Sequence, residues 1–264
     1  MKILRGKKPH NQAPDTFREL LSSWEELGYC EVIDQDDDEF CWVGNIGRTL
    51  LYEYPRPDIS GIPANFSLIL SGNTPLSLPT YRPWIFWGRH PQQLFKMHKD
   101  PPLPYKERDI ESIFLGKVEN HIQLANRVKF DWSSCISFFN MPVHLGDSYA
   151  SNYTFTQKEY LEFLSQSKFG LCLPGYGPKC NREIEYLALG VVPIFTPFTD
   201  ISYHRPLIKD EHYFFAETPN DVAAIIRGCS EDQWHEMSQK GMEWFKKNCS
   251  PLGSFETTCE ILKS

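Results

Sequence analysis

The sequence predicts an α/β fold, and the second half of the chain carries the main evidence. Two apolar runs of strand length, Phe169–Leu173 and Val191–Phe195, stand on either side of a helical segment. The first run leads into a Gly/Pro loop at 174–180, and the helix over 182–189 is closed by Gly190. Strand, loop, helix and strand in this order are typical of parallel βα units whose strands are buried.

Further elements continue the pattern on both sides of this unit. Residues 113–115 are predicted as a short strand, and 121–127 as a helix after the loop that begins at Gly116. Two capping boxes, Thr156 to Glu159 and Ser230 to Gln233, predict helix starts because the side chains of each box satisfy free backbone N–H groups. Thr218 followed by a proline predicts another start.

In the first half, predicted strands and helices alternate less regularly. Residues 1–14 are polar and contain proline, which predicts a loose arm. Asp15 can cap a helix over 17–27 that ends at Gly28. The predicted strands are Tyr29–Ile33, Phe40–Val43, Thr49–Tyr54, Phe66–Leu70 and Trp84–Trp87. The second and third of these strands flank the turn at 44–47, so we expect a hairpin.

A stiff linker is predicted between the two halves. Lys99–Tyr105 contains three prolines in seven residues, a composition that favours an extended chain. We therefore expect two domains, an acceptor-side domain over 1–105 and a nucleotide-sugar-binding domain over 106–264.

The composition excludes several classes of protein. The chain of 264 residues has a net charge of −7 and no basic run, so nucleic acid is not an expected partner. No apolar run approaches the roughly 20 residues that cross a bilayer, and the N-terminus lacks the apolar stretch of a signal peptide. The eight cysteines show no metal-binding spacing. We expect a cytoplasmic protein without disulfides.

The Gly/Pro loop carries the chemistry of the predicted site. Gly175 and Gly177 allow the backbone to approach a ligand closely, and the loop feeds a helix N-terminus, which favours an anion. Arg182 lies in the first helical turn and could pair with a phosphate, and Lys179 adds charge. Glu185, three residues on, could accept hydrogen bonds from a ribose. From spacing alone, an ordinary βα turn with a surface Arg–Glu pair fits equally well.

A family resemblance favours the functional interpretation. The segments 167–177 (SKFGLCLPGYG), 181–186 (NREIEY) and 190–194 (GVVPI) resemble the donor-binding signature of exostosin-like glycosyltransferases, and Phe114–Lys117 resembles the start of that family's C-terminal domain. The resemblance covers roughly residues 110–200. It implies a GT-B architecture, in which two Rossmann-like domains face each other across a cleft. The implied donor-binding residues are Gly116, Lys117, Arg127, Gly175, Tyr176, Gly177, Lys179, Asn181, Arg182 and Glu185.

Within that resemblance, Arg182 would bind the donor diphosphate and Glu185 the ribose. The segments 50–55 (LLYEYP) and 84–91 (WIFWGRHP) look like those of small glycosyltransferases of large algal DNA viruses that build capsid glycans, one of which transfers xylose. That likeness implies a UDP-linked donor such as UDP-xylose, a glycan acceptor and a place in the host cytoplasm. Exostosins are membrane proteins of the secretory pathway, whereas no membrane anchor is predicted here, and a first domain of about 105 residues is short for half of a GT-B fold. The acceptor class therefore does not carry over.

The catalytic base is expected in the first half, across the cleft from the donor. An inverting transferase needs a carboxylate or a histidine to remove the proton of the acceptor hydroxyl. Glu53, at the end of an apolar strand, is the first candidate, and Asp38 and His90 follow. A retaining enzyme would need no such base.

Two other functions remain open from the sequence. The acidic run Asp34–Glu39 contains the Asp-x-Asp spacing that holds a divalent metal in GT-A transferases. We interpret it as a solvated acidic turn, and expect neither a metal nor any other cofactor, since the nucleotide sugar is a substrate. The last alternative is a carbohydrate-binding module on an inactive transferase fold.

Overall fold

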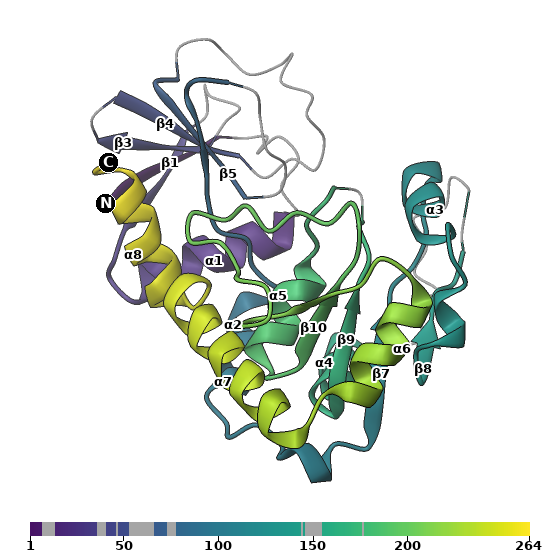
Figure 1. Cartoon of the computed structure of the whole chain (residues 1–264). Coiled ribbons are helices and arrows are strands. Elements are labelled where there is room, and N and C mark those ends of the chain that lie inside the picture. Colours follow the sequence, from purple (N-terminus) through teal and green to yellow (C-terminus); the bar gives the residue numbers. More distant parts are fainter. Residues whose placement is uncertain are drawn as a thin grey trace.

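The chain forms two α/β halves, each built on its own sheet (Figure 1). The computed structural model describes residues 1–6, 14–35, 41–45, 47–52, 66–72, 78–143, 145, 155–175 and 177–264. The strands of the first sheet are β1 (Lys2–Gly6), β2 (Glu31–Gln35), β3 (Cys41–Asn45), β4 (Gly47–Tyr52), β5 (Leu68–Ser71) and β6 (Tyr81–Pro83). Their order is β2-β1-β3-β4-β5-β6. The pairs β1–β3 and β3–β4 are antiparallel and the other pairs are parallel.

The second sheet is entirely parallel. Its strands are β7 (Ile110–Leu115), β8 (Phe138–Asn140), β9 (Ser167–Cys172), β10 (Val192–Phe195) and β11 (Phe214–Phe215). They lie in the order β11-β10-β9-β7-β8. All their carboxyl ends therefore meet at one edge of the sheet, which is where open α/β sheets bind their ligands.

Eight α-helices surround the two sheets in the part of the chain that the structure describes. They are α1 (Pro14–Glu26), α2 (Pro91–His98), α3 (His121–Arg127), α4 (Gln157–Ser165), α5 (Asn181–Ala188), α6 (Pro219–Gly228), α7 (Glu231–Asn248) and α8 (Pro251–Ile261). Two short 3₁₀ turns, Tyr105–Glu107 and Trp132–Ser134, accompany them. The two-sheet α/β arrangement confirms the predicted fold class.

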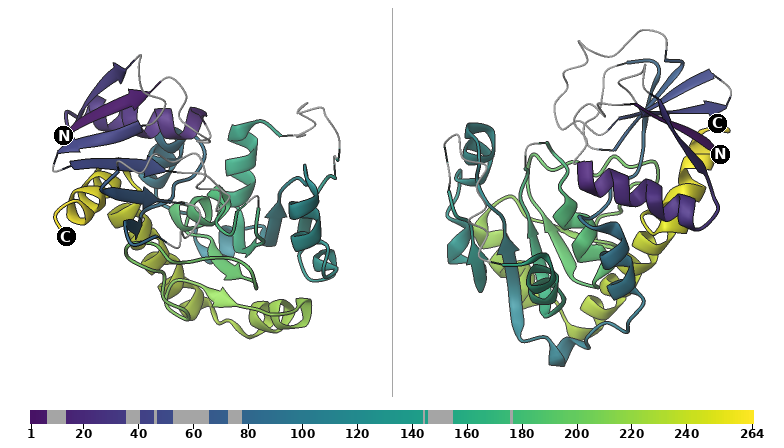
Figure 2. Two further views of the ribbon diagram at one scale, coloured as in Figure 1. Left: turned by 90° about the horizontal axis from the view of Figure 1, so that it is seen from above. Right: turned by 180° about the vertical axis from the view of Figure 1, so that it is seen from behind.

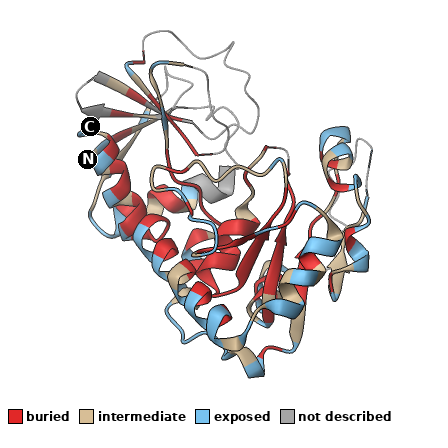
Figure 3. Ribbon diagram, in the orientation of Figure 1, coloured by how far each residue is buried: buried red, intermediate tan, exposed pale blue. Residues whose placement is uncertain are grey.

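Both faces of the second sheet are covered, which explains why its strands are apolar throughout. Ile113 and Leu115 pack in one core cluster with residues of α4 and α5. Phe114, between them in sequence, points to the other face and packs with residues of α6 and α7. The strands at the centre of this half are accordingly buried along most of their length (Figure 3).

The end of the chain returns to the first half. Trp24 of α1 and Trp84 each donate an indole hydrogen bond of 2.8 Å to α8, to Ser254 Oγ and Thr258 Oγ1. Ile261 belongs to the core of the first sheet. The N- and C-termini consequently lie on the same side of the molecule (Figure 2). The packing of the first half thus includes a helix that lies beyond the predicted boundary in sequence.

Several local predictions are confirmed. The hairpin forms, with β3 and β4 antiparallel around the predicted turn. Thr156 and Glu159 form the capping box of α4, and α3 has the predicted bounds. Gly190, directly after the last turn of α5, has a φ of 66°, a conformation that glycine adopts without a steric cost.

Two predictions in the first half are wrong. The predicted loose arm contains β1, whose Lys2–Gly6 pairs with both β2 and β3; residues 7–13 lie outside the described part. Trp84–Trp87 is not a strand, because the last strand of the sheet, β6, ends at Pro83. The two tryptophans are buried instead in irregular backbone, where their rings make an edge-to-face contact at 5.2 Å.

Candidate active site

The candidate site lies at the carboxyl ends of β7 and β9, where α5 begins. Gly116 follows β7 directly, and the Gly/Pro loop follows β9. The loop turns sharply because Gly175 N–H donates to the carbonyl of Gly177 at 3.0 Å. It ends at Cys180, the N-cap of α5. The sequence therefore folds locally as predicted, with a strand, a tight loop and a helix start.

Arg182 is buried in the first turn of this helix. Its side chain is only 7% exposed, and its Nε donates to the carbonyl of Leu115 at 3.0 Å. The guanidinium lies 4.3 Å from the centre of the Phe114 ring. Its Nη1 is buried and has no hydrogen-bond partner among the residues that the structure describes. A buried donor without a partner is costly, so this nitrogen is suited to an anion that enters from outside.

Arg127, the last residue of α3, also lies near the Phe114 ring. It is 3% exposed, and its guanidinium lies 5.7 Å from the centre of Phe114. Its Nε donates to the carbonyl of Pro174 at 2.8 Å, and its Nη1 to that of Lys117. Burial, and then the positive charge of Arg182, lower the pKa of Arg127.

These two arginines form a pair of buried positive charges, which we call the arginine pair. Within the described residues, neither guanidinium makes an ion pair with a carboxylate. Like charges that are buried close together repel each other, and this repulsion is relieved when an anion binds between them. The arrangement is suited to a diphosphate, which carries two adjacent anionic groups.

Two glycines leave room for the arginine pair. A Cβ atom at Gly116 would lie 2.5 Å from Arg182 Nη2 and 3.0 Å from Phe114 Cζ. A Cβ atom at Gly175 would lie 2.6 Å from the sulfur of Cys180 and 3.5 Å from Arg127 Nη2. A side chain at either position would force its neighbours to move.

Glu183 is a charged group of this site that the sequence analysis missed. It is 1% exposed, and its Oε2 accepts a hydrogen bond of 2.6 Å from Cys180 N–H. Its Oε1 has no hydrogen-bond partner in the described part of the chain. Burial raises its pKa to about 7, although the positive charges of Arg182 and Arg127 act in the opposite direction. The signal in the sequence was its position, since a glutamate at the third residue of a helix commonly caps it.

Glu185 and Lys179 are fully engaged by other parts of the protein. Glu185 is 1% exposed; its Oε1 accepts from Arg89 N–H at 2.9 Å and its Oε2 from Tyr160 Oη at 2.7 Å. Lys179 donates to the carbonyl of Ser202 at 2.9 Å, and its Nζ lies 3.5 Å from a carboxylate oxygen of Asp200. Their predicted contacts with ribose and phosphate stay predictions.

The remaining donor-site residues surround the helix start. Asn181 donates from its side chain to the carbonyl of Trp87 at 2.8 Å, which ties the first half to α5. Lys117 forms an ion pair with Glu119. Tyr176 lies outside the described residues.

Of the three candidate bases, the structure describes His90 alone, because Glu53 and Asp38 lie outside the described residues. His90 precedes α2 with a φ of 49°, a left-handed conformation that is uncommon for a residue with a side chain. Its Nδ1 lies 2.9 Å from Glu19 Oε1 of α1. A carboxylate only accepts, so Nδ1 carries the proton, and Nε2 of the neutral ring is left as the acceptor.

The acidic run shows one partner within the described part. Asp34 pairs with Arg5 through two hydrogen bonds, of 2.7 and 3.0 Å, and this contact lowers its pKa. No cluster of three or more histidine, cysteine, aspartate or glutamate side chains gathers among the described residues.

No described helix is long and apolar enough to cross a membrane. Every cysteine whose side chain the structure describes is a free thiol.

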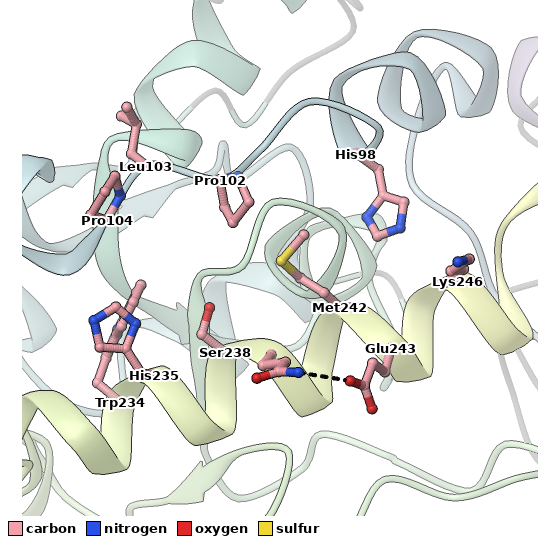
Figure 4. A pocket seen from close by; sticks show the side chains of 11 residues that line it. His98, Pro102, Leu103, Pro104, Trp234, His235, Ser238, Met242, Glu243 and Lys246 are labelled. Carbon is pink, nitrogen blue, oxygen red and sulfur yellow. Dashed lines mark hydrogen bonds between the residues drawn. The ribbon is translucent and has the colours of Figure 1, made fainter.

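A cavity of about 540 Å³ lies elsewhere, between the proline linker and α7 (Figure 4). Pro102, Leu103 and Pro104 line one side, and Trp234 and Met242 line the other. These linker residues precede β7, so the cavity lies toward the amino ends of the strands. None of the predicted site residues lines it.

No family model and no curated protein matches the sequence. Solved structures that resemble the chain are distant glycosyltransferases. HepE of Anabaena, crystallised with UDP and glucose, is 8% identical, with 99% of each chain covered and a TM-score of 0.49. A glycosyltransferase of Rickettsia africae is 10% identical, with 96% of this chain and 83% of that chain covered and a TM-score of 0.46. The trehalose-6-phosphate synthase OtsA is 11% identical, with 94% and 76% covered and a TM-score of 0.47.

At these identities and TM-scores, the likenesses carry no activity over to this chain. They also do not test the exostosin or viral resemblance, which stays a prediction.

Proposed function

We propose that this protein is a GT-B glycosyltransferase that takes a sugar from a nucleoside diphosphate, most simply UDP, and moves it to a hydroxyl group of a glycan. The observation that carries the proposal is the arginine pair. Two guanidiniums are buried at the carboxyl edge of a parallel sheet, and within the described ranges no carboxylate pairs with them and Nη1 of Arg182 has no partner. A protein that bound only carbohydrate would have no use for such a site.

The chemistry follows from the charges. When the acceptor oxygen attacks the anomeric carbon, the bond from that carbon to the diphosphate oxygen breaks. Negative charge then grows on the leaving diphosphate. The arginine pair would stabilise this charge, and preorganised positive groups in a site with little water are effective at doing so. The free N–H groups at the start of α5 would contribute in the same direction.

Calorimetric titration of UDP tests the proposal. Arg182→Met should weaken UDP binding by roughly 30-fold or more, because removing one side of a buried charge pair costs about 2 kcal/mol or more. Arg182→Lys should recover little of the affinity, because an ammonium cannot make the planar two-point contact of a guanidinium.

Arg227→Met is the matched control, since Arg227 is exposed on α6 and the variant should bind UDP as the wild type does. If the wild type does not bind UDP or any other nucleoside diphosphate, or if Arg182→Met binds within twofold of it, the assignment fails.

For an inverting reaction, we propose His90 as the base, because its contact with Glu19 orients the ring. The hydrogen bond to Glu19 fixes the ring with Nε2 as the acceptor, and this nitrogen would take the proton of the acceptor hydroxyl. His90→Ala should lower turnover at saturating donor by roughly 10²- to 10⁴-fold, with UDP affinity unchanged. If turnover persists, Glu53→Gln and Asp38→Asn are the next variants, and a retaining enzyme would tolerate all three.

Removal of metal separates this mechanism from the GT-A alternative. In the proposed mechanism, the arginine pair takes the part of a divalent ion, so transfer should continue in EDTA. Complete loss of transfer in EDTA that is restored by Mn²⁺ would favour a metal-dependent mechanism and would direct attention to Asp34–Asp38.

A further inference from the structure

An exposed phenylalanine lies on the segment that follows β10, close to the Gly/Pro loop. Phe198 is 60% exposed, which is unusual for a ring at the carboxyl end of a buried strand. It follows β10, the neighbour of β9 in the sheet. Most phenylalanines of this half are packed into its core clusters, so the exposure of this ring calls for a physical reason.

The backbone at Phe198 is held in a conformation that disfavours phenylalanine. Thr199 N–H donates to the carbonyl of Thr196 at 3.3 Å, which closes a β-turn with Pro197 at its second position. Phe198 occupies the third position with a φ of 73°. This is the position of a type II turn at which glycine is preferred. A bulky side chain there strains the backbone, and such strain is concentrated at functional sites.

Two contacts hold this turn close to the Gly/Pro loop and to Lys129. Asp200 N–H donates to the carbonyl of Pro178 at 3.0 Å, which joins the segment after the turn to the Gly/Pro loop. On the other side, Nζ of Lys129 lies 5.1 Å from the centre of the Phe198 ring. Lys129 is only two residues after Arg127. The turn that carries the ring therefore lies close both to the segment that follows Arg127 and to the Gly/Pro loop.

We propose that Phe198 is the platform on which the base of the nucleotide sugar stacks. Lys129, beside this ring, would donate a hydrogen bond to the base or to the phosphates of the nucleotide. This inference rests on the proposed function, because it assigns the base of the same ligand whose diphosphate binds the arginine pair. A flat exposed ring supplies a stacking surface for any base. A strained turn that projects this ring into solvent is explained if a ligand covers it.

Phe198→Gly tests the platform without damaging the fold. Glycine is the residue that the turn prefers, so the melting temperature should stay the same or rise. UDP affinity, measured by calorimetry, should fall by about 5- to 100-fold, the range expected for the loss of one stacked base. Affinity for inorganic pyrophosphate, which has no base, should be unchanged. Phe198→Tyr keeps a ring and should bind UDP as the wild type does.

Phe215→Gly is the matched control, because Phe215 is also partly exposed, on β11 at the edge of the same sheet. It should leave UDP affinity unchanged. If Phe198→Gly binds UDP with wild-type affinity, Phe198 is not the stacking platform. This holds even if the variant loses affinity for UDP-glucose, because the ring would then contact the sugar and not the base. That result leaves the proposed function standing as long as UDP binding depends on Arg182. If wild-type protein fails to bind UDP, both proposals fall.

Discussion

Two buried arginines of the second half, Arg108 and Arg182, face the same electrostatic problem and solve it differently. Arg108 is 2% exposed and donates to three backbone carbonyls, of Leu103, Ser167 and Leu189, at 3.0, 2.6 and 3.0 Å. Arg182 is 7% exposed and donates to one carbonyl, with a buried nitrogen left over.

The difference distinguishes a structural charge from one that awaits a ligand. Burial lowers the pKa of Arg108 to about 10, and its three carbonyls join the linker to β9 and to the end of α5. Arg108 thus completes its hydrogen bonds within the fold, whereas Arg182 keeps donor capacity at the edge where ligands bind. Four substitutions test this distinction.

Arg108→Met should strongly destabilise the protein. It removes three charge-assisted hydrogen bonds and leaves buried carbonyls without a partner, which costs about 3 kcal/mol or more. Urea unfolding measures this loss. UDP affinity of the folded protein should be unchanged, because Arg108 lies toward the amino ends of the strands. A variant as stable as the wild type would contradict the structural role of Arg108.

Glu183→Gln should change how stability depends on pH. Burial raises the folded-state pKa of Glu183 from 4.5 to about 7. The neutral carboxyl is therefore favoured in the fold, and its contribution is fully present below pH 4.5 and is lost as the pH rises through 7. The wild type should lose up to about 3 kcal/mol across this window relative to Glu183→Gln. The free energy of unfolding of both proteins is measured by urea unfolding at several pH values. The same pH dependence in both would contradict the raised pKa of Glu183.

Gly116→Ala should weaken donor binding while the fold persists. The added Cβ would lie 2.5 Å from Arg182 Nη2, so the guanidinium must move, and UDP affinity should fall on the order of tenfold, which equals about 1.4 kcal/mol. Gly228→Ala is the control, because a Cβ there meets nothing within 4 Å. Equal UDP affinities of the two variants would argue that Arg182 does not contact the donor.

Arg182→Met should have the smallest effect on the stability of the protein without ligand. The substitution removes a single hydrogen bond, from Nε to the carbonyl of Leu115, and it also relieves the repulsion between Arg182 and Arg127. We therefore expect a loss of about 1 kcal/mol. Urea unfolding in the absence of UDP measures it. A loss as large as that of Arg108→Met would make Arg182 a structural residue too and would remove the contrast.

Local patterns were predictable from the sequence because they depend on neighbouring residues. Thr156 caps α4 through contacts within three residues. Gly190 adopts the left-handed conformation that ends α5, and the buried strand before the Gly/Pro loop is apolar because both faces of its sheet are covered. The position of Arg182 in the first turn of its helix follows from the same short-range rules.

Elements stabilised by distant contacts were not predictable in this way. The strand β1 was read as a loose arm, since its pairing with β3 lies far from it in the sequence. The return of α8 to the first half depends on hydrogen bonds from Trp24 and Trp84, which are 230 and 174 residues away from their partners.

The amino-acid sequence is enough to predict the alternating strands and helices of the second half and the loop that leads into Arg182. Contacts between distant segments bring Arg127 and Arg182 to one ring and provide the partners of Glu185 and Lys179. They also bury Glu183 near the arginine pair. The physical reason is that hydrogen bonds of helices and turns join near neighbours, whereas the environment of a charge is set by every segment that packs around it.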